Sequence, residues 1–259
     1  MIYFFKSCPQ KKRKILKIDW GLNCLMKRVD IVIPVFNNSK DIPWSVENQY
    51  KFYEKRLKEY KWNIIIADNA STDETKDIVK NLMQKFKRLK YMYIPKQGRG
   101  GAIEYSFLKS KADVLIYMDV DLATKLDALP TMVKLLAKNK ADIVTGSRYH
   151  AKSKTKRKFS RFVLSKCFNG LLKLVLHVHF TDAQCGFKGM RKEIVKKLLP
   201  MIKDKKWFWD TEMLYLAEKN GYRIKEIPIT WYEAESSSVK LLPTILEFLA
   251  GIFRLKWMR

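Results

Sequence analysis

Two aspartates, Asp119 and Asp121, directly follow the apolar run DVLIYM at residues 113–118. A short apolar run of this kind predicts a buried strand, and alternate residues at the end of a strand point the same way. Two carboxylates placed in this way can bind one hard divalent cation. Mg²⁺ or Mn²⁺ would suit the pair, because these ions take oxygen ligands and complete their shell with water and substrate phosphates. The alternative is that Asp121 or Thr124 caps the following helix.

The elements that must position these aspartates alternate between strand and helix. Apolar runs predict strands at 29–35, 63–67, 91–95, 113–118 and 141–146, and helical patterns follow them up to residue 60, over 72–86, from 101 and over 125–138. Short apolar runs separated by helices predict an α/β fold with a mainly parallel sheet covered on both faces. In such sheets, ligands bind beyond the carboxyl ends of the strands.

The loops at those carboxyl ends carry polar residues. They are Asn37 and Asn38, Asp68 and Asn69, residues 97–101, Asp119 and Asp121, and Ser147 with Arg148. This edge therefore predicts a site for a polar, phosphate-bearing ligand. The glycines at 98, 100 and 101 do not form the G-x-G-x-x-G pattern, so we do not expect NAD. They either let the backbone approach a nucleotide or open a helix.

The second half of the chain begins with a basic segment, 151–181, which has eight lysines and arginines, no acidic residue and an apolar second half. It predicts a basic amphipathic helix at a membrane surface; the alternative is a solvated basic face with a core-packing end. His177 and His179 are expected to pack on this helix or to lie at an interface, and His150 is likewise not expected to bind zinc. Later elements are a strand at 184–189, helices at 191–199 and 209–219, a strand at 223–232 and an amphipathic helix from 241.

Composition limits the possible partners and the compartment. The chain has 259 residues, 47% of them hydrophobic, which is enough for one large domain with a substantial core. A net charge of +26 predicts attraction to nucleic acid, a membrane surface or phosphorylated small molecules. Four cysteines without C-x-x-C spacing favour a reducing compartment. No apolar run approaches the length of a membrane-spanning helix.

We expect three regions: a basic tail at 1–27, an α/β domain at 28–240 and an amphipathic helix at 241–259. The tail lacks the order of a secretory signal, since its apolar residues precede its charges. Because a strand is predicted just after Met26, residues 1–25 are either a basic tail or sequence upstream of the true start. We favour the second interpretation.

Seven motifs occur in order along the chain. They are IVIPVFNN, IIIADNASTDET, KQGRGGAIEYS, MDVDLAT, TGSRY, TDAQCGFKGMRKE and WFWDTEMLYLAEKNGYRIKEIPITW. Together they resemble the inverting glycosyltransferases of family 2, which implies a GT-A (Rossmann-like) fold over residues 28–257. The DAQCGFK and WDTEMLYLAEKNGYRIKEIP blocks look like dolichyl-phosphate mannose synthases, dolichyl-phosphate glucosyltransferases and bacterial undecaprenyl-phosphate relatives.

The resemblance implies a set of donor-binding residues. They are Pro34, Phe36 and Asn38 along the nucleoside, Asp68 at the base or ribose, Asp119, Val120 and Asp121 at the diphosphate and metal, and Arg148 and Lys240 near the phosphates. It also implies that Arg148 and Arg161 bind donor or acceptor phosphates, with Ser165 and Asn169 completing the motif of Arg161. We expect Asp121, Arg148, Arg161 and Asp210 to be the catalytic residues.

Three positions depart from the family pattern. Asn38 stands where a glutamate is usual, Ala70 replaces a glycine, and Ala123 stands where many mannose synthases have a metal-binding glutamine. An alanine methyl cannot coordinate a cation, so a water would have to take that place. Ala123 argues against mannose more than against catalysis.

The function implied by the resemblance is transfer of a hexose from a GDP-mannose or UDP-glucose type of donor to a polyprenyl or dolichyl phosphate. The enzyme would contact the cytosolic face of a membrane peripherally. An acceptor phosphate is already ionised and needs little help from a base, so alignment and charge stabilisation would carry catalysis.

Three alternatives remain open at this point. A family 2 enzyme acting on a glycan would need a general base, for which Asp210 and Asp182 are candidates. A degenerate member of the fold would bind without turnover. Asp182, Asp210 and Glu212 either lie on the acceptor side or cap helices and pair with lysines. A nucleic-acid-binding protein is disfavoured, because the basic residues form no recognised module and the paired aspartates would have no role.

Overall fold

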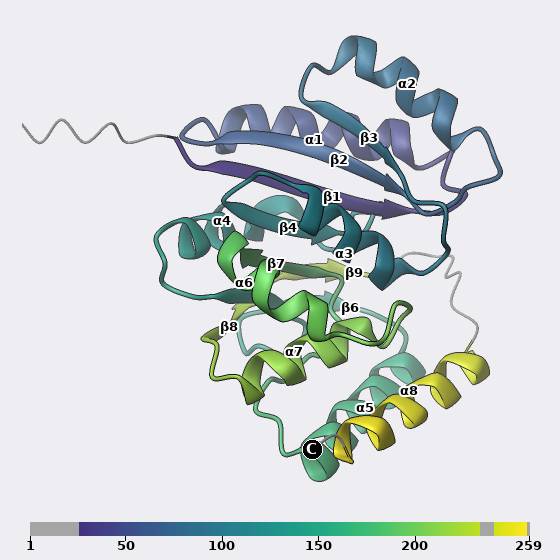
Figure 1. Ribbon diagram of the computed structural model, residues 1–259, viewed down its shortest axis with the longest axis vertical. Coiled ribbons are helices and arrows are strands. Elements are labelled where there is room, and N and C mark those ends of the chain that lie inside the picture. The colour runs from purple at the N-terminus through teal and green to yellow at the C-terminus, as the bar shows by residue number, and fades with distance from the viewer. Residues whose placement is uncertain (1–25, 234–240, 258–259) are drawn as a thin grey trace, which may run out of the picture.

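The computed structural model describes residues 26–233 and 241–257, which form a three-layer α/β fold around one large sheet (Figure 1). The sheet order is β3-β2-β1-β4-β7-β5-β8. The strands are β1 (Arg28–Val35), β2 (Lys61–Asp68), β3 (Leu89–Tyr93), β4 (Val114–Met118), β5 (Ile143–Ser147), β7 (Phe187–Arg191) and β8 (Ile224–Pro228). Every pairing is parallel except those of β7. The predicted α/β, mainly parallel sheet is confirmed.

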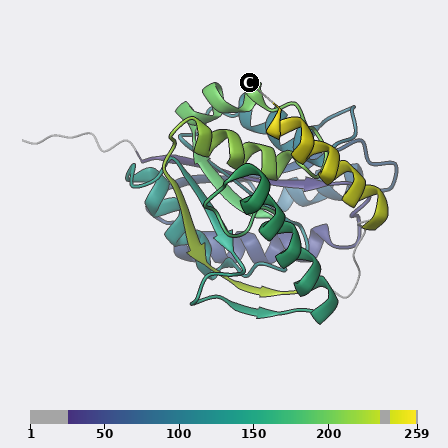
Figure 2. The same cartoon turned by 90° about the horizontal axis from the view of Figure 1, so that it is seen from below.

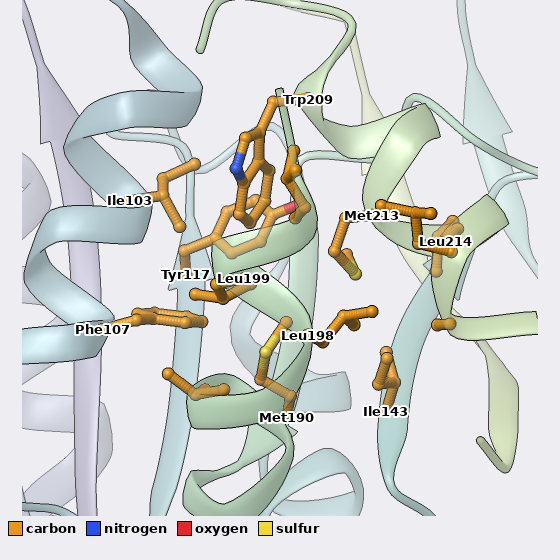
Figure 3. Packing of buried hydrophobic residues seen from close by; sticks show 14 of the residues in the cluster. Ile103, Phe107, Tyr117, Ile143, Met190, Leu198, Leu199, Trp209, Met213 and Leu214 are labelled. Carbon is orange, nitrogen blue, oxygen red and sulfur yellow. The ribbon is translucent and has the colours of Figure 1, made fainter. Parts of the chain in front are cut away.

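Helices cover both faces of this sheet. They are α1 (Ile42–Arg56), α2 (Thr75–Lys85), α3 (Arg99–Lys109), α4 (Leu129–Ala137), α5 (Phe159–Leu176), α6 (Lys192–Leu198), α7 (Trp209–Lys219) and α8 (Leu241–Lys256), with short 3₁₀ turns at Leu126–Ala128 and Leu199–Met201. One core lies under α1, α2 and α4, and the other under α3, α6 and α7 with the inner sides of α5 and α8. Figure 3 shows part of the second core, where Tyr117 of β4 packs near Trp209 of α7.

The central strand β4 sends alternate residues to the two cores. Leu115 and Tyr117 face the α3 and α7 side, whereas Ile116 and Met118 face the α1 and α4 side. This alternation follows from the two-residue period of a strand. The order β2-β1-β4 reverses the direction of chain progress between β1 and β4. The paired aspartates therefore follow a strand at a topological switch point, where ligands bind in this class of fold.

Several predicted elements differ in detail. The strand expected at 223–232 is two strands, because β8 ends at Pro228 and β9 (Thr230–Tyr232) pairs with β6 (Lys154–Lys156) in a separate two-stranded sheet. The strands expected at 91–95 and 184–189 are β3 and β7, displaced by two or three residues. A turn and β6 occupy the start of the basic segment, and α5 begins only at residue 159.

The two amphipathic helices, α5 and α8, lie side by side at one end of the molecule (Figures 1 and 2). Phe168 and Phe248 join them, with ring centroids 4.9 Å apart. Among the described residues, no helix is both long enough and apolar enough to cross a membrane. The expected tail at 1–25 and the predicted phosphate-binding Lys240 lie outside the described residues.

Candidate active site

The first aspartate of the pair, Asp119, is held by an arginine from α3. Its Oδ1 accepts a 2.7 Å hydrogen bond from Nη2 of Arg99, and 46% of its side chain is exposed. Asp119 comes two residues after Tyr117, which accounts for its position on the α3 side of the sheet. One oxygen of this carboxylate is thus fixed by the protein, while the group still reaches solvent.

The other oxygen of Asp119 lies over Gly186, in the loop before β7. A Cβ atom on Gly186 would lie 1.7 Å from Oδ2 of Asp119 and 2.6 Å from its Cγ. Such distances are far inside van der Waals contact, so only glycine leaves room for this carboxylate. The glycine of the DAQCGFK motif therefore has a steric reason at the site.

The second aspartate, Asp121, closes a turn instead of capping a helix. Its Oδ1 accepts a hydrogen bond from the backbone N–H of Ala123 at 3.0 Å. The helical segment after it starts at Leu126 without any side-chain cap, so the capping alternative for Asp121 and Thr124 is wrong. Burial raises the pKa of Asp121, and the charge of Asp119 raises it further. A cation bound between the two carboxylates would relieve that repulsion.

The donor atoms at this turn fit a hard divalent cation only in part. Within the described ranges, no group of three or more His, Cys, Asp and Glu side chains could hold a metal ion. Asp119 and Asp121 supply carboxylate oxygens, and Ala123 supplies none from its side chain. Mg²⁺ commonly binds through one or two carboxylates together with water and substrate phosphates. The pair fits such an ion if a diphosphate completes its shell.

Behind Asp119, charged side chains alternate in sign from the surface to the interior. Arg99 also donates from Nη1 to Oδ2 of Asp210 at 2.7 Å, and Nζ of Lys188 donates to Oδ1 of Asp210 at 2.9 Å. Tyr117 donates its hydroxyl to the same Asp210 oxygen. Lys188 is fully buried, and its ammonium group also donates to two backbone carbonyls of the loop before β7. We call Lys188, Asp210, Arg99 and Asp119 the charge row.

The charge row determines the state of Asp210. Burial alone would raise the pKa of Asp210, but Lys188 and Arg99 outweigh it and hold the pKa below its ordinary value. Both carboxylate oxygens accept hydrogen bonds from cations. Asp210 is therefore an ionised, fully engaged anchor, and a carboxylate of this kind is a weak base.

Asp182 is engaged in the same manner by Arg148. Its Oδ2 accepts hydrogen bonds from the backbone nitrogen and Nε of Arg148, at 2.9 and 2.8 Å, and its Oδ1 accepts one from Nη2 at 2.7 Å. Burial opposes ionisation, yet Arg148 holds the pKa of Asp182 below its ordinary value. The guanidinium also lies over the ring of Trp231, 5.4 Å from its centroid. Arg148, predicted to bind phosphate, is thus already in a bidentate ion pair.

Two of the predicted nucleoside residues follow β1 at the switch point. Phe36 is 44% exposed, and its backbone N–H donates to Oδ1 of Asn38 at 3.1 Å. Asn38 Nδ2 donates to Asp41, so this residue organises the turn before α1. Pro34 lies within β1, beside Ala67 of β2. An exposed ring on a fixed turn is suited to stack against a flat ligand.

The predicted base-binding residue, Asp68, is buried and fully hydrogen-bonded. Its Oδ1 accepts from the backbone N–H of Ser71 at 2.9 Å, and its Oδ2 accepts from the hydroxyl of Tyr91 at 2.6 Å. Ala70 has φ = 63°, in the left-handed region where a glycine is favoured. The family glycine that Ala70 replaces thus has a conformational reason. Val120, between the two aspartates, is buried in the core on the α1 side.

The basic side of the site begins where α5 starts. Nη1 of Arg161 pairs with Oε1 of Glu233 at 2.8 Å, and the arginine side chain is 42% exposed. The hydroxyl of Ser165 contacts that of Tyr149, at 2.5 Å. Asn169 donates to the backbone carbonyl of Ser165, at 2.8 Å. Arg161 therefore fastens α5 to the end of β9, and Ser165 and Asn169 continue its inner side.

Gly100 and Gly101 lie in the first turn of α3. The backbone N–H groups of Gly100 and Gly101 donate to the carbonyls of Lys206 and Lys205, at 3.2 and 2.8 Å. A Cβ atom on Gly100 would lie 2.3 Å from the Cβ of Trp209. Close packing against Trp209, the first residue of α7, therefore accounts for Gly100, and the two backbone hydrogen bonds hold the start of α3, where Arg99 lies.

The structure separates the alternatives left open for three titratable residues. His177 ends α5 with φ = 53°, and His179 lies beyond the helix with its side chain 90% exposed and Nδ1 2.6 Å from Glu218. These histidines therefore do not pack along the helix. Glu212 is buried, pairs with Arg254 of α8 at 2.8 Å and has no contact with the aspartates, so it holds α7 to α8.

The sequence reasoning missed Arg99, Lys188, Tyr117 and Gly186. A buried lysine in a strand would have been the strongest available signal, because Lys188 interrupts the apolar pattern of β7. Arg99 lies 111 residues from Asp210 and gave no local signal.

The sequence was compared with known protein families and with curated proteins. The model of the family described as glycosyl transferase family 2 matches residues 30–199. Glycosyltransferase AglD of Haloferax volcanii is 34% identical over 88% of this chain, which spans only 37% of that relative's length. Dolichyl-phosphate beta-glucosyltransferase ALG5C of Trichomonas vaginalis is 30% identical, and the alignment covers 98% of this chain and 81% of the relative.

Solved structures give the same fold. Glucosyl-3-phosphoglycerate synthase of Mycobacterium tuberculosis, solved with Mn²⁺, uridine diphosphate and phosphoglyceric acid, superimposes with a TM-score of 0.67. The two chains are 14% identical, and the match covers 90% of this chain and 80% of that one. At this identity the likeness extends to the fold alone.

Proposed function

The chain belongs to glycosyltransferase family 2, and from this premise we propose that it transfers a hexose from a nucleotide-diphosphate sugar to a polyprenyl or dolichyl phosphate, inverting the anomeric configuration. The name of the Trichomonas relative supports glucose as the sugar and dolichyl phosphate as the acceptor. Ala123, in place of the glutamine of many mannose synthases, supports glucose over mannose.

The observation that carries the choice of acceptor is the state of the two buried aspartates. Transfer to a glycan hydroxyl needs a base that removes a proton, and Asp182 and Asp210 were the candidates. Both are fixed by arginine or lysine with their pKa held low. A phosphate monoester has its second pKa at about 6, so it attacks as an anion without a base. A phosphate acceptor therefore suits this site better than a glycan.

At the donor end, Asp119 and Asp121 would hold Mg²⁺ or Mn²⁺ together with the diphosphate. Such a cation would neutralise charge that develops on the leaving nucleoside diphosphate. Arg99 keeps Asp119 oriented from behind, and Gly186 leaves space for it. Phe36, on the turn after β1, would stack against the nucleoside. One in-line displacement at the anomeric carbon would invert the configuration.

At the acceptor end, α5 and α8 would contact the cytosolic face of a membrane. Large apolar side chains stand exposed on both helices: Phe159 and Leu174 on α5, Leu246 and Phe253 on α8, and Trp257 just after it. We call these five residues the apolar patch. Lysines at 152, 154, 156, 158 and 166 lie nearby in sequence. Each basic residue near an anionic surface contributes about 1 kcal/mol before screening. Apolar insertion combined with this attraction is typical of peripheral contact.

The test is a transfer assay with purified protein, UDP- and GDP-hexoses, Mg²⁺ or Mn²⁺ and a short polyprenyl phosphate, read by mass spectrometry. We expect a lipid-linked hexose that requires the metal. Asp121→Ala should reduce its formation by about a thousandfold, since the lost charge stabilisation is several kcal/mol. Asp113→Ala removes a carboxylate from the opposite end of β4 and serves as the matched control.

Two results would contradict the proposal. Transfer to a glycan, with none to the lipid phosphate, would favour the glycan alternative. Nucleotide binding without turnover on any acceptor would favour a degenerate member of the family.

A further inference from the structure

The three arginines on the basic side of the site differ in their partners. Arg148 is paired with Asp182 and Arg161 with Glu233. Arg157, just before α5, forms no ion pair with any carboxylate of the described residues; the hydrogen bonds of its guanidinium go to two hydroxyl groups. It is thus a cation whose charge the described part of the protein leaves uncompensated.

The guanidinium of Arg157 is nevertheless fixed in place. It lies over two neighbouring rings, 4.8 Å from the centroid of Tyr149 and 4.5 Å from that of Phe162. Nη1 donates to the hydroxyl of Ser165 at 3.1 Å and reaches that of Tyr149 at 3.5 Å. Aromatic faces of this kind stabilise a cation and limit its rotation. The side chain is therefore preorganised without a counter-ion.

One donor of this guanidinium lacks a partner. Nε of Arg157 is buried and has no hydrogen-bond acceptor. A buried N–H without an acceptor is unfavourable, and such groups are rare in folded proteins. An anion seated against the guanidinium would supply charge and acceptor oxygens together. Nε is closed to a ligand in this arrangement, whereas Nη2 makes no hydrogen bond with the described residues and is not among their buried atoms, so it remains to donate to a phosphate oxygen.

The position of Arg157 relative to the paired aspartates follows from strand pairing. The backbone N–H of Tyr232 in β9 donates to the carbonyl of Ala123, two residues after Asp121, at 2.9 Å. On its other side, Tyr232 is in register with Lys156 of β6. Two strand spacings separate Ala123 from Lys156, about 10 Å, and Arg157 is the next residue. This separation leaves room for a sugar between a diphosphate at the aspartates and an anion at Arg157.

We propose that Arg157 is the residue that binds the phosphate of the acceptor, with Ser165 beside it, whereas Arg148 and Arg161 hold the frame through their carboxylate partners. The inference rests on the proposed function and deepens it. The N-terminus of α5 does not supply this site, because the backbone N–H of Lys158 already donates to Oε2 of Glu233 at 2.7 Å. Exposed Phe159 would bring the prenyl chain toward the apolar patch.

The experiment compares Arg157→Gln with Lys158→Gln, which removes one positive charge from an exposed neighbouring side chain. Calorimetric titration with geranyl phosphate measures acceptor binding, and titration with nucleoside diphosphate measures donor binding. We expect Arg157→Gln to lower the affinity for geranyl phosphate by about ten- to a hundredfold, which is the contribution of one charged hydrogen bond. The affinity for the nucleoside diphosphate should be unchanged. Lys158→Gln should change neither more than about twofold.

Anionic lipid headgroups present the same chemistry, so a second arm measures sedimentation with phosphatidylserine vesicles. Arg157→Gln should reduce vesicle binding no more than Lys158→Gln does. A loss confined to vesicles would overturn the inference, since Arg157 would then be a general membrane contact. Arg157→Lys keeps the positive charge but loses the planar guanidinium. Its affinity for geranyl phosphate should lie between those of the wild type and Arg157→Gln. It also gives a folded reference if the glutamine variant proves unstable.

Failure of this inference can be told apart from failure of the proposed function. If the wild type glycosylates geranyl phosphate and Arg157→Gln does so with an unchanged KM for the acceptor, only the role of Arg157 is wrong. If the wild type neither binds nor glycosylates a prenyl phosphate, the proposed acceptor itself is wrong.

Discussion

The two ends of the site treat charge in opposite ways. At the aspartate end, the charge row alternates Lys188, Asp210, Arg99 and Asp119, and every member has an opposite charge as neighbour. At the basic end, Arg157 lies over two aromatic rings without a carboxylate partner among the described residues. Paired charges hold each other in a fixed geometry, whereas an unpaired cation is available to bind an anionic ligand. Under the proposed function, this difference predicts that the donor side is built in advance and that the acceptor completes the other side.

Burial explains why pairing is needed at the aspartate end. Lys188 is fully buried, and a lysine in that position must be compensated by charge and hydrogen bonds. Arg157 lies nearer to solvent, where an isolated cation costs less. The buried cation thus has a structural role, and the cation near the surface is the one for which we propose a binding role.

The largest effect is expected from Lys188→Met, which removes the innermost cation of the charge row. Removing one partner of a buried pair leaves Asp210 facing Arg99 and Tyr117 without its inner cation, so we expect unfolding to become easier by about 3–5 kcal/mol. Urea denaturation followed by tryptophan fluorescence measures it. Lys192→Met is the control, because Lys192 is only partly buried and bonds two backbone carbonyls, not a carboxylate. Equal stability of the two variants would mean that the charge row is not a structural unit.

A smaller effect is expected from a substitution that displaces Asp119 without removing any charge. Gly186→Ala places a Cβ where Oδ2 of Asp119 now lies, so the carboxylate must shift. A misplacement on the order of 1 Å at a reacting site can lower kcat/KM by about a hundredfold. Steady-state kinetics and donor titration measure the effect, with thermal unfolding as a check of the fold. Gly170→Ala is the control, because it adds the same methyl group on α5 at a position where a Cβ atom would have no neighbouring atom within 4 Å. This variant should leave kcat/KM unchanged.

The sequence predicted the frame of this site better than its interior contacts. The paired aspartates and the switch-point loops follow from apolar runs and their spacing, which are local properties. The charge row joins α3, β4, β7 and α7, and its pairs become neighbours only after the sheet has formed. Arg148 and Arg161 were recognisable as basic positions, but their carboxylate partners, 34 and 72 residues away, were not. The sequence analysis therefore marked two arginines that are paired and did not single out Arg157, which has no carboxylate partner among the described residues.

A test of the basic end changes the apolar patch. Phe253 is 67% exposed on α8, and moving a phenylalanine side chain out of water contributes about 1.5–3 kcal/mol. Phe253→Ser should weaken binding to anionic vesicles by about tenfold or more while leaving transfer to soluble geranyl phosphate intact. Leu108→Ser, at a 41% exposed position on α3 outside the patch, is the control. Equal binding of Phe253→Ser and wild type would place the membrane contact elsewhere.

The smallest expected effect comes from a paired carboxylate outside the site. Asp142, before β5, accepts hydrogen bonds from Arg223 and Arg191, and the bonds from Arg223 do most to hold the pKa of Asp142 below its ordinary value. Because Arg223 is half exposed, screening should limit the loss in Asp142→Asn to about 1–2 kcal/mol.

The pH dependence gives this last test its sign. A carboxylate with a lowered folded pKa stabilises the protein above its unfolded pKa, about 3.9, and loses that contribution as pH falls toward the folded value. Urea unfolding of wild type and Asp142→Asn should therefore differ most above about pH 4 and converge in stronger acid. A difference that stays constant with pH would mean that packing, not charge, accounts for Asp142. Convergence would show that the ionised carboxylate accounts for the effect of Asp142. A difference of only about 1–2 kcal/mol above pH 4 would then assign the larger cost of Lys188→Met to the buried position of the charge row.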